Sequence, residues 1–337
     1  MTAREFWTRW RREIVRGTFL FAAVLAVGLL IISGVHRARS GVRDLALEFG
    51  GGGRHGGPRS EWAPWLYSAR LGPRQTLWIR NVRGPITIES GDGDSAVISA
   101  VRTFGRSNPE SVRFITGTNA QGVAVCAVWG ASTAGATCEP GASGSPKGHD
   151  VGDNDVEVRF DIRLPKGVAA DVQTVNGDVK ATVAGPVTAG TVQGDVAITS
   201  AAGKVDASTV TGDVSVELPG VLNPSSVRAQ TVTGDVSVAL VPGVCAAVSG
   251  HTVTGDISTE FSVPVTGQFA THDMSGTIGK GGGIVRMETV TGDVTLNRIS
   301  DAATTVVVPA PAVRPAHGAH PAPRARAGVV PPPPGKP

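Results

Sequence analysis

Aromatic residues are scarce in this chain of 337 residues, which contains one Tyr, six Trp and nine Phe. They make up only 5% of the sequence, so large rings cannot build most of a core. Glycine (45) and proline (23) are abundant, and hydrophobic residues account for 41%. Small β-branched side chains and Gly must therefore supply the core and turns, which favours strands over helices.

Strong net charge is also missing, and this argues against nucleic acid as a partner. The formal net charge is +3, with Arg concentrated towards both ends of the chain. Between residues 153 and 300, Asp and Glu outnumber Lys and Arg. Aromatic and basic residues are not interleaved in the way that single-strand binding proteins use. We therefore expect no nucleic-acid binding by the folded part.

Sequence signatures of catalysis are absent. The seven His residues are scattered, and none stands beside a Ser or Cys in a nucleophile motif. The Gly-rich stretch 48–57 lacks the Gly-Lys-Ser/Thr ending of a phosphate loop, and no Cys/His set has zinc spacing. We predict a non-enzymatic protein with no catalytic residue, metal, cofactor or small-molecule substrate. A carbohydrate-active β-helix enzyme is the least favoured alternative, with these acidic candidates: Asp206, Glu217, Asp273 and Glu288.

Cysteine is rare, and the spacing of the three cysteines is informative. Cys126 and Cys138 flank a loop of small residues, which is typical of a stapled hairpin or loop. Such a disulfide would stabilise the fold by about 3 kcal/mol in an oxidising compartment. The alternative is a pair of unbridged small hydrophobic side chains. Cys245 has no partner left, and we expect it to be a buried apolar residue.

One long apolar run is present, from Thr18 to Val35, and it contains no charged residue. It is just long enough to cross a bilayer as a helix. Five Arg residues and two Trp residues precede it, so the positive-inside rule places the N-terminus in the cytoplasm. A cleaved signal peptide and a buried core helix are the alternatives. With either an anchor or a signal peptide, the chain after residue 40 lies outside the cytoplasm.

The composition divides the chain into five segments. The expected order is a basic cytoplasmic tail (1–17), a transmembrane helix (18–35), a Gly/Arg/Pro-rich stalk (36–73), a β-strand repeat domain (74–300) and a disordered Pro/Ala-rich tail (301–337). Within the stalk, the region around Trp65 could begin an edge strand. Strict alternation is expected to place one apolar face on these residues: Val156, Val158, Phe160, Ile162 and Leu164.

A ten-residue pattern recurs from Gln173 to Leu296, as in AQTVTGDVSVAL at residues 229–240. A period-2 reading puts Val232, Gly234, Val236 and Val238 on one inward face, with Thr and Asp facing outwards. The inward Gly predicts a strand that bends there. The repeat glycines are Gly177, Gly194, Gly212, Gly234, Gly255, Gly276 and Gly292.

A repeat period of about 20 residues predicts stacked supersecondary units. We expect a mainly β fold, a right-handed β-solenoid or β-helix-like stack that follows one N-terminal transmembrane helix. An antiparallel β-sandwich is the alternative, because the repeat spacing becomes irregular after Gly212.

Stacking would align the repeat aspartates along one edge. The candidates are Asp178, Asp195, Asp213, Asp235, Asp256 and Asp293. A calcium ladder is one interpretation, but each repeat offers one carboxylate where calcium needs six to eight oxygens. The favoured interpretation is a solvated turn residue that bonds nearby backbone N–H groups, so that the motif is architectural.

The order of these features resembles a bacterial adhesin-like family of unknown function built of β-strand repeats. The resemblance rests on QTLWIRNVRGPITIE (75–89), VAVCAVWG (123–130), VEVRFDIRLPKGVAADVQTVNGDVKAT (156–182) and the Thr-Val-x-Gly-Asp-Val series, and covers roughly residues 74–298. It implies a solenoid-like, non-enzymatic envelope protein, and the family defines no site residues. Some relatives are linked to envelope stress sensing. A more distant resemblance is to bactofilin-like polymers, which an extracytoplasmic disulfide would argue against.

These patterns together predict a single-pass protein of the cell membrane with its repeat domain outside the cytoplasm. We expect the domain to serve surface contact or scaffolding with an envelope protein or a glycan, through outward Thr, Ser and Asp rows. The alternative is a regulatory component of an envelope stress response, in which the Arg-rich segment 4–16 contacts a cytoplasmic partner.

Overall fold

The computed structural model describes residues 59–130, 136–142, 154–268 and 271–299. The predicted cytoplasmic tail, transmembrane segment 18–35 and C-terminal tail 301–337 lie outside these residues, as does most of the predicted stalk. Within the described ranges, no helix has both the length and the apolar character to cross a membrane.

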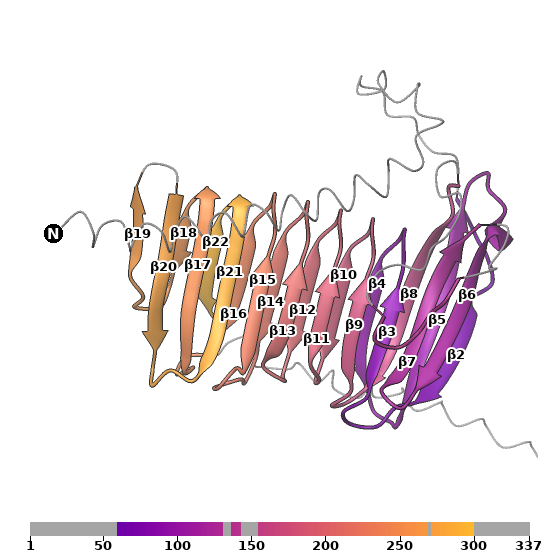
Figure 1. Cartoon of the computed structure of the whole chain (residues 1–337), viewed down its shortest axis with the longest axis horizontal. Coiled ribbons are helices and arrows are strands. Elements are labelled where there is room, and N and C mark those ends of the chain that lie inside the picture. Colours follow the sequence, from indigo (N-terminus) through magenta and orange to yellow (C-terminus); the bar gives the residue numbers. More distant parts are fainter. Residues whose placement is uncertain (1–58, 131–135, 143–153, 269–270, 300–337) are drawn as a thin grey trace, which may run out of the picture. The chain divides into compact units, whose positions relative to one another are not determined.

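The described domain is mainly β and contains two eleven-stranded sheets (Figure 1). The first sheet, called sheet A, has these strands in spatial order: β1 (Ser60–Glu61) with β2 (Trp65–Arg70), β5 (Ser95–Phe104), β8 (Glu157–Pro165), β4 (Ile86–Gly91), β10 (Val179–Val183), β12 (Val196–Ser200), β14 (Val214–Leu218), β16 (Val236–Leu240), β22 (Val294–Arg298) and β18 (Ile257–Thr259).

The second sheet, called sheet B, has the order β6 (Val112–Asn119), β7 (Gly122–Trp129), β3 (Thr76–Arg80), β9 (Ala169–Gln173), β11 (Val187–Gly190), β13 (Lys204–Ser208), β15 (Ser226–Gln230), β21 (Gly283–Thr291), β17 (Ala246–Thr254), β20 (Thr271–Ile278) and β19 (Val265–Gln268). A single 3₁₀ turn, Pro109–Ser111, is the one helical element in the described ranges.

Each coil of the repeat contributes one strand to each sheet and so forms one rung. Successive rungs pair in parallel and in register, as in Val216 opposite Val238 in sheet A and Val205 opposite Val227 in sheet B. The solenoid-like expectation therefore holds for the repeat strands. Antiparallel pairs occur only towards the ends of the two sheets, so the antiparallel sandwich does not describe the repeat.

The core between the sheets is aliphatic. Val196, Val214 and Val236 are in register on sheet A and are buried, and Ile198, Val216 and Val238 form the next buried row. No aromatic residue occurs between Phe160 and Phe261, so the middle rungs depend on Val, Ile, Leu and Ala. Full burial of each Val or Ile stabilises the fold by roughly 1.5–3 kcal/mol.

Larger side chains close the two ends of this core. At the end near β8, the Trp65 and Phe114 rings stack at 4.7 Å, and Phe114 meets Phe160 edge-on at 5.9 Å. At the far end, buried Phe261 lies beneath the Arg298 guanidinium, 4.9 Å from its ring centre. Both ends of the stack are thereby shielded from water.

The spatial order of the rungs departs from the chain order after Leu240. The chain leaves β16 and forms β17 and β18, then β19 and β20, and only then returns as β21 and β22. The returning strands lie between the earlier ones: β21 pairs with both β15 and β17, and β22 pairs with both β16 and β18. The last rung in the sequence is therefore inserted into the stack (Figure 1).

Two sequence expectations need correction. Gly276 is not a repeat glycine, because it lies in antiparallel β20 opposite Val248. The first strands, β1 and β2, fall inside the stretch 36–73 that was expected to be a stalk. Residues 120–121 connect β6 to β7. The alternating face from Val156 to Leu164 is confirmed, since all five apolar side chains are buried.

Candidate functional site

The repeat glycines sit in the turn that links sheet B to sheet A within each rung. Gly234 has φ +142°, and a Cβ there would lie 2.0 Å from the carbonyl oxygen of Gly212 on the preceding rung. No larger residue fits without moving one rung away from the next. The chain bends at Gly234 as expected, but the expected inward-facing position is wrong, because Gly234 is only half-buried. The same positive φ and close approach are shared by Gly177, Gly194, Gly212, Gly255 and Gly292.

In a straight strand, successive side chains alternate between the core and the solvent, and this turn shifts that alternation by one residue. Thr231, expected outside, is buried, whereas Val232 is only half-buried. The Thr231 hydroxyl donates to the Gly212 carbonyl at 2.9 Å, and so satisfies a carbonyl that the turn directs inwards. Equivalent bonds join Thr191 to Gly177, Thr209 to Gly194, Thr289 to Gly234 and Thr252 to Gly292. The expectation of outward Thr rows is therefore wrong for the first threonine of each motif, whereas the threonine directly before the glycine is exposed as expected, at Thr211, Thr233, Thr254 and Thr291.

The repeat aspartates form a ladder along the same edge. The backbone N–H of Asp235 donates to Asp213 Oδ1 at 2.8 Å, and Asp213 N–H donates to Asp195 Oδ1 at 2.8 Å. The ladder continues through Asp178 at one end and through Asp293 and Asp256 at the other. In the first rung, the strand that pairs with β10 is β4, and the residue before β4 is Pro85, which has no carboxylate. The ladder therefore begins at Asp178. These carboxylates therefore join neighbouring rungs.

The predicted disulfide between Cys126 and Cys138 is present. It holds residues 136–142 over the outer side of sheet B, where Trp78, Ala124 and Val128 form a second, smaller core. Arg80 is 3% exposed, and it donates to the Ala142 carbonyl at 3.2 Å and to Asp171 Oδ1 at 2.9 Å. Cys245 forms no disulfide. It is half-buried, whereas a buried position was expected.

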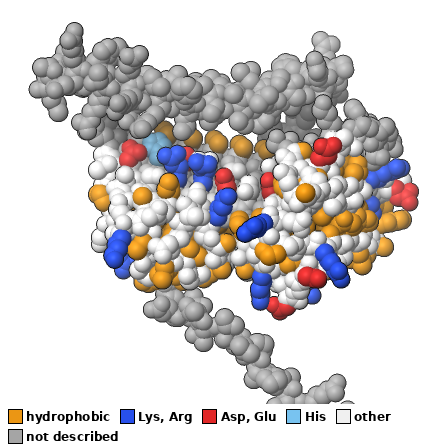
Figure 2. All heavy atoms as spheres, turned by 60° about the horizontal axis from the view of Figure 1, so that its bottom comes forward, with side chains coloured by type: hydrophobic (Ala, Val, Ile, Leu, Met, Phe, Trp, Pro, Cys, Tyr) orange, Lys and Arg blue, Asp and Glu red, His pale blue; other side chains and the backbone are white. Residues whose placement is uncertain are grey.

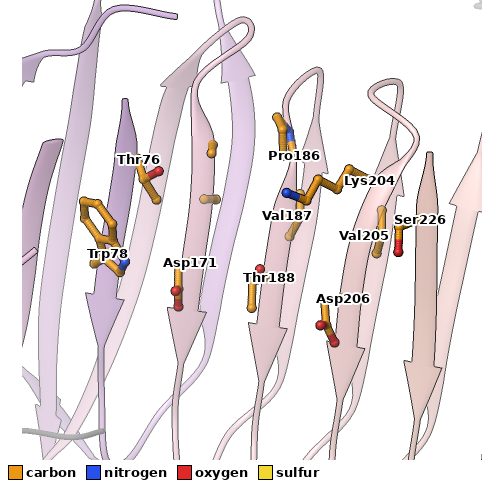
Figure 3. A pocket seen from close by; sticks show the side chains of 12 residues that line it. Thr76, Trp78, Asp171, Pro186, Val187, Thr188, Lys204, Val205, Asp206 and Ser226 are labelled. Carbon is orange, nitrogen blue, oxygen red and sulfur yellow. The ribbon is translucent and has the colours of Figure 1, made fainter. Parts of the chain in front are cut away.

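A groove of about 270 Å³ crosses the outer face of sheet B beside this segment (Figure 3). One side chain on each of four adjacent strands forms a row along it. The row is Trp78 on β3, Asp171 on β9, Thr188 on β11 and Asp206 on β13, all in register. Neighbouring members of the row are thus one strand spacing apart, about 4.8 Å.

The groove exists because small side chains lie between larger ones. Ala169 and Pro186 line its middle, while Trp78 on β3 stands at one end and Ser226 on β15 at the other, next to Lys204 on β13 (Figure 3). The Lys204 side chain extends from β13 across β11 (Figure 3). The floor is the sheet itself, because Ala170, Val187 and Val205 point into the core. The groove is therefore shallow and open, and its floor is the rigid surface of the sheet.

Opposite charges balance along the groove. Asp171 pairs with Arg80, and Asp206 Oδ2 lies 3.7 Å from Arg228 Nη1. Lys204 makes no ion pair with any residue that the structure describes. On the face shown in Figure 2, acidic and basic side chains are interspersed and no large patch of one sign appears. The groove offers one carboxylate held by a buried arginine, a second and more exposed carboxylate, a hydroxyl and an ammonium group rather than a field of one sign.

A second hollow, of about 340 Å³, lies on the outer face of sheet A. Its rim includes Val97, Glu89 and Arg163, which are in register across β5, β4 and β8. No aromatic side chain lines it. It therefore provides fewer kinds of contact than the groove on sheet B.

The acidic candidates for a carbohydrate-active enzyme do not gather. Asp206 lies in the groove on β13, whereas Glu217 is on β14 in the other sheet. Asp273 and Glu288 flank His251 in register, and His251 Nδ1 is 2.7 Å from Asp273 Oδ1. In the described ranges, no group of three or more His, Cys, Asp or Glu is arranged to hold a metal ion. Sequence reasoning missed Trp78, Asp171, Thr188 and Lys204, since only the strand register aligns them.

Comparisons with known proteins support the repeat architecture. Residues 166–297 match the family described as Toastrack DUF4097. No curated protein matches the chain. A solved structure, described as "a putative cell adhesion protein from Clostridium sporogenes", shares 12% identity and covers 70% of this chain and 100% of its own, with a TM-score of 0.39. At that TM-score the likeness carries no functional weight.

Replacing Gly234 by Ala is expected to destabilise the domain by about 2 kcal/mol or more, because the new Cβ meets the Gly212 carbonyl. The matched control is Gly220→Ala, which also has positive φ (+76°) but no heavy atom within 4 Å of the added Cβ. We expect the control to cost only about 1 kcal/mol. Chemical denaturation of both variants measures the difference, and equal losses would contradict the proposed close approach.

Removing the disulfide with the double variant Cys126→Ser/Cys138→Ser is expected to lower the free energy of unfolding by about 3 kcal/mol. It should also increase solvent exposure of Trp78, because the covering segment loses its covalent attachment. Denaturation and tryptophan fluorescence, with Trp78→Phe to isolate the signal, measure the two effects. Cys245→Ser is the control, and a double variant that behaves like this control would contradict the prediction.

Proposed function

We propose that this chain is a non-enzymatic, membrane-anchored protein of the cell envelope that displays its β-stack outside the cytoplasm for surface contact. The contact surface is the outer face of sheet B, and the observation that carries this choice is the open groove between Trp78 and Lys204. The partner is an envelope protein or a glycan.

The stack is suited to hold a surface in fixed geometry. Each rung is joined to the next by two parallel backbone ladders, by a buried Thr hydroxyl and by an Asp carboxylate. Such a close-packed stack deforms little, so side chains on neighbouring rungs keep a fixed spacing. Contact residues placed on its outer faces therefore need no further ordering on binding, which lowers the entropic cost of association.

The open form of the groove favours contact with a larger partner. Its volume of about 270 Å³ lies just below the range of about 300–1,000 Å³ that encloses small-molecule ligands. Its floor is a continuous sheet surface with a row of polar side chains. These features support recognition of a short stretch of an extended partner rather than enclosure of a substrate.

Two features support the compartment. The disulfide between Cys126 and Cys138 is a feature of proteins in oxidising compartments. The apolar run from Thr18 to Val35, with its preceding Arg residues, supports one membrane span with the N-terminus inside. Together they support a domain that faces away from the cytoplasm.

The topology predicts that the full chain sediments with membranes and resists extraction by salt and carbonate. In cells whose outer wall has been removed, added protease should digest the repeat domain. The same samples should show a mobility difference between reducing and non-reducing gels, because of the Cys126–Cys138 bond. A domain that resists protease and contains free thiols would place the stack in the cytoplasm and overturn this part of the proposal.

The contact surface is tested by two matched substitutions, Thr188→Arg and Thr182→Arg. Both threonines are exposed, one on the outer face of sheet B and the other on sheet A. We expect Thr188→Arg to abolish most co-sedimentation of the detergent-solubilised full chain with envelope fragments freed of membrane, while Thr182→Arg leaves it unchanged. Equal binding by the wild-type chain and Thr188→Arg would rule out sheet B as the contact surface.

A further inference from the structure

The groove on sheet B combines hydrogen-bonding groups with carbon-rich surfaces in a regular array. Pro186 offers a half-buried ring and Ala169 a methyl group, while Trp78, which is only 8% exposed, closes one end, and between them stand Asp171, Thr188 and Asp206. The polar members repeat at one strand spacing, about 4.8 Å. This array fits a ligand with a repeating structure that has hydroxyl groups along its edges and C–H groups on its faces.

We propose that this groove binds sugar rings of an extended polysaccharide chain that runs across β9, β11 and β13. This inference rests on the proposed function and names its partner class. A sugar ring presents hydroxyl groups around its edge and C–H groups on its faces, so it matches both kinds of surface in the groove. The Pro186 ring and the Ala169 methyl group receive the C–H faces, while carboxylates and hydroxyls receive the hydroxyl edges.

The Asp171 carboxylate is held ready for this role. Arg80 Nη1 bonds Asp171 Oδ1 at 2.9 Å, and the guanidinium is almost completely buried behind the groove. An ionised carboxylate can accept about four hydrogen bonds, so the remaining lone pairs of Asp171 stay available. Arg228 on β15 lies 3.7 Å from Asp206 Oδ2, but both of these side chains are about half exposed, so this pair is held less firmly. Because Arg80 is buried in the sheet, the Asp171 acceptor is oriented before a ligand arrives.

The sheet geometry disfavours an extended peptide as the occupant. Peptides commonly bind a sheet by adding a strand to a free edge, where backbone groups are unpaired. The groove instead lies over β9, β11 and β13, each of which is bonded to a strand on both sides. The small side chains of Ala169 and Ser226 also leave no deep pocket for a peptide side chain. A ligand in this groove can therefore be recognised only by the side chains of the sheet, and the hydroxyl groups of a sugar can bond to such side chains.

The test is direct binding of the full-length chain to defined oligosaccharides, in a detergent that carries no sugar head group. The probes are cellohexaose, chitohexaose and a hexamer of galacturonate, titrated by calorimetry. Thr188→Phe fills the groove, and Asp206→Asn removes one charged acceptor without changing its size. The control is Thr182→Phe, which places the same ring on an exposed Thr of sheet A.

We expect at least one probe to bind, and both groove variants to weaken that binding at least tenfold, about the effect of losing one charged hydrogen bond. Thr182→Phe should bind as the wild-type chain does. The proposal is overturned if no probe binds, or if binding is the same for wild type and Thr188→Phe. Correct folding of each variant is verified by an unchanged denaturation midpoint.

A second measurement distinguishes a polysaccharide partner from the broader proposal that sheet B contacts some component of the envelope. Envelope fragments are treated either with periodate, which cleaves vicinal diols of sugars, or with protease. Loss of co-sedimentation after periodate alone supports a glycan partner. Loss after protease alone, with periodate without effect, overturns the saccharide assignment and leaves sheet B as a surface for an envelope protein.

Discussion

The contact between successive turn glycines is the constraint on which the rest of this structure depends. Each glycine lies against the carbonyl of the glycine one rung away, as Gly234 does against Gly212. This approach fixes the rungs at β-strand spacing, so the strands on both sides of the turn pair in parallel and in register. The buried threonine hydroxyls and the aspartate ladder are consequences, because both satisfy backbone groups that the tight turn exposes.

Much of the fold follows from periodicity, and the exceptions have physical reasons. Alternation within strands correctly identifies buried faces, as from Val156 to Leu164, because a strand has period two. The same rule fails at Thr231 and Val232, since a glycine with positive φ reverses the alternation between them and the next strand. The inserted rung and the role of Gly276 depend on pairing between distant segments, which local sequence does not encode.

The groove illustrates the same limit for function. Trp78 and Asp206 are far apart in the sequence, and no motif connects them. Only the register of β3, β9, β11 and β13 aligns their side chains in one row. The motif residues that look functional, Thr and Asp, are instead used to join rungs. The stack thus separates its tasks: turn residues maintain the architecture, and outward residues on the strands are free to specialise for recognition.

The inserted rung has a consequence for how the chain can be completed. As the polypeptide emerges from N- to C-terminus, β17 and β18 are made before β21 and β22, yet they occupy positions beyond them. Until residues 283–298 arrive, the earlier coils and the distal strands share no continuous ladder, because β15 and β17 are each bonded to β21 instead. A molecule cut short before Gly283 would not be a shorter solenoid. It would have a gap in each sheet, with the facing edges of β15 and β17 unpaired in sheet B and those of β16 and β18 unpaired in sheet A, so the stack closes only when the last rung is made.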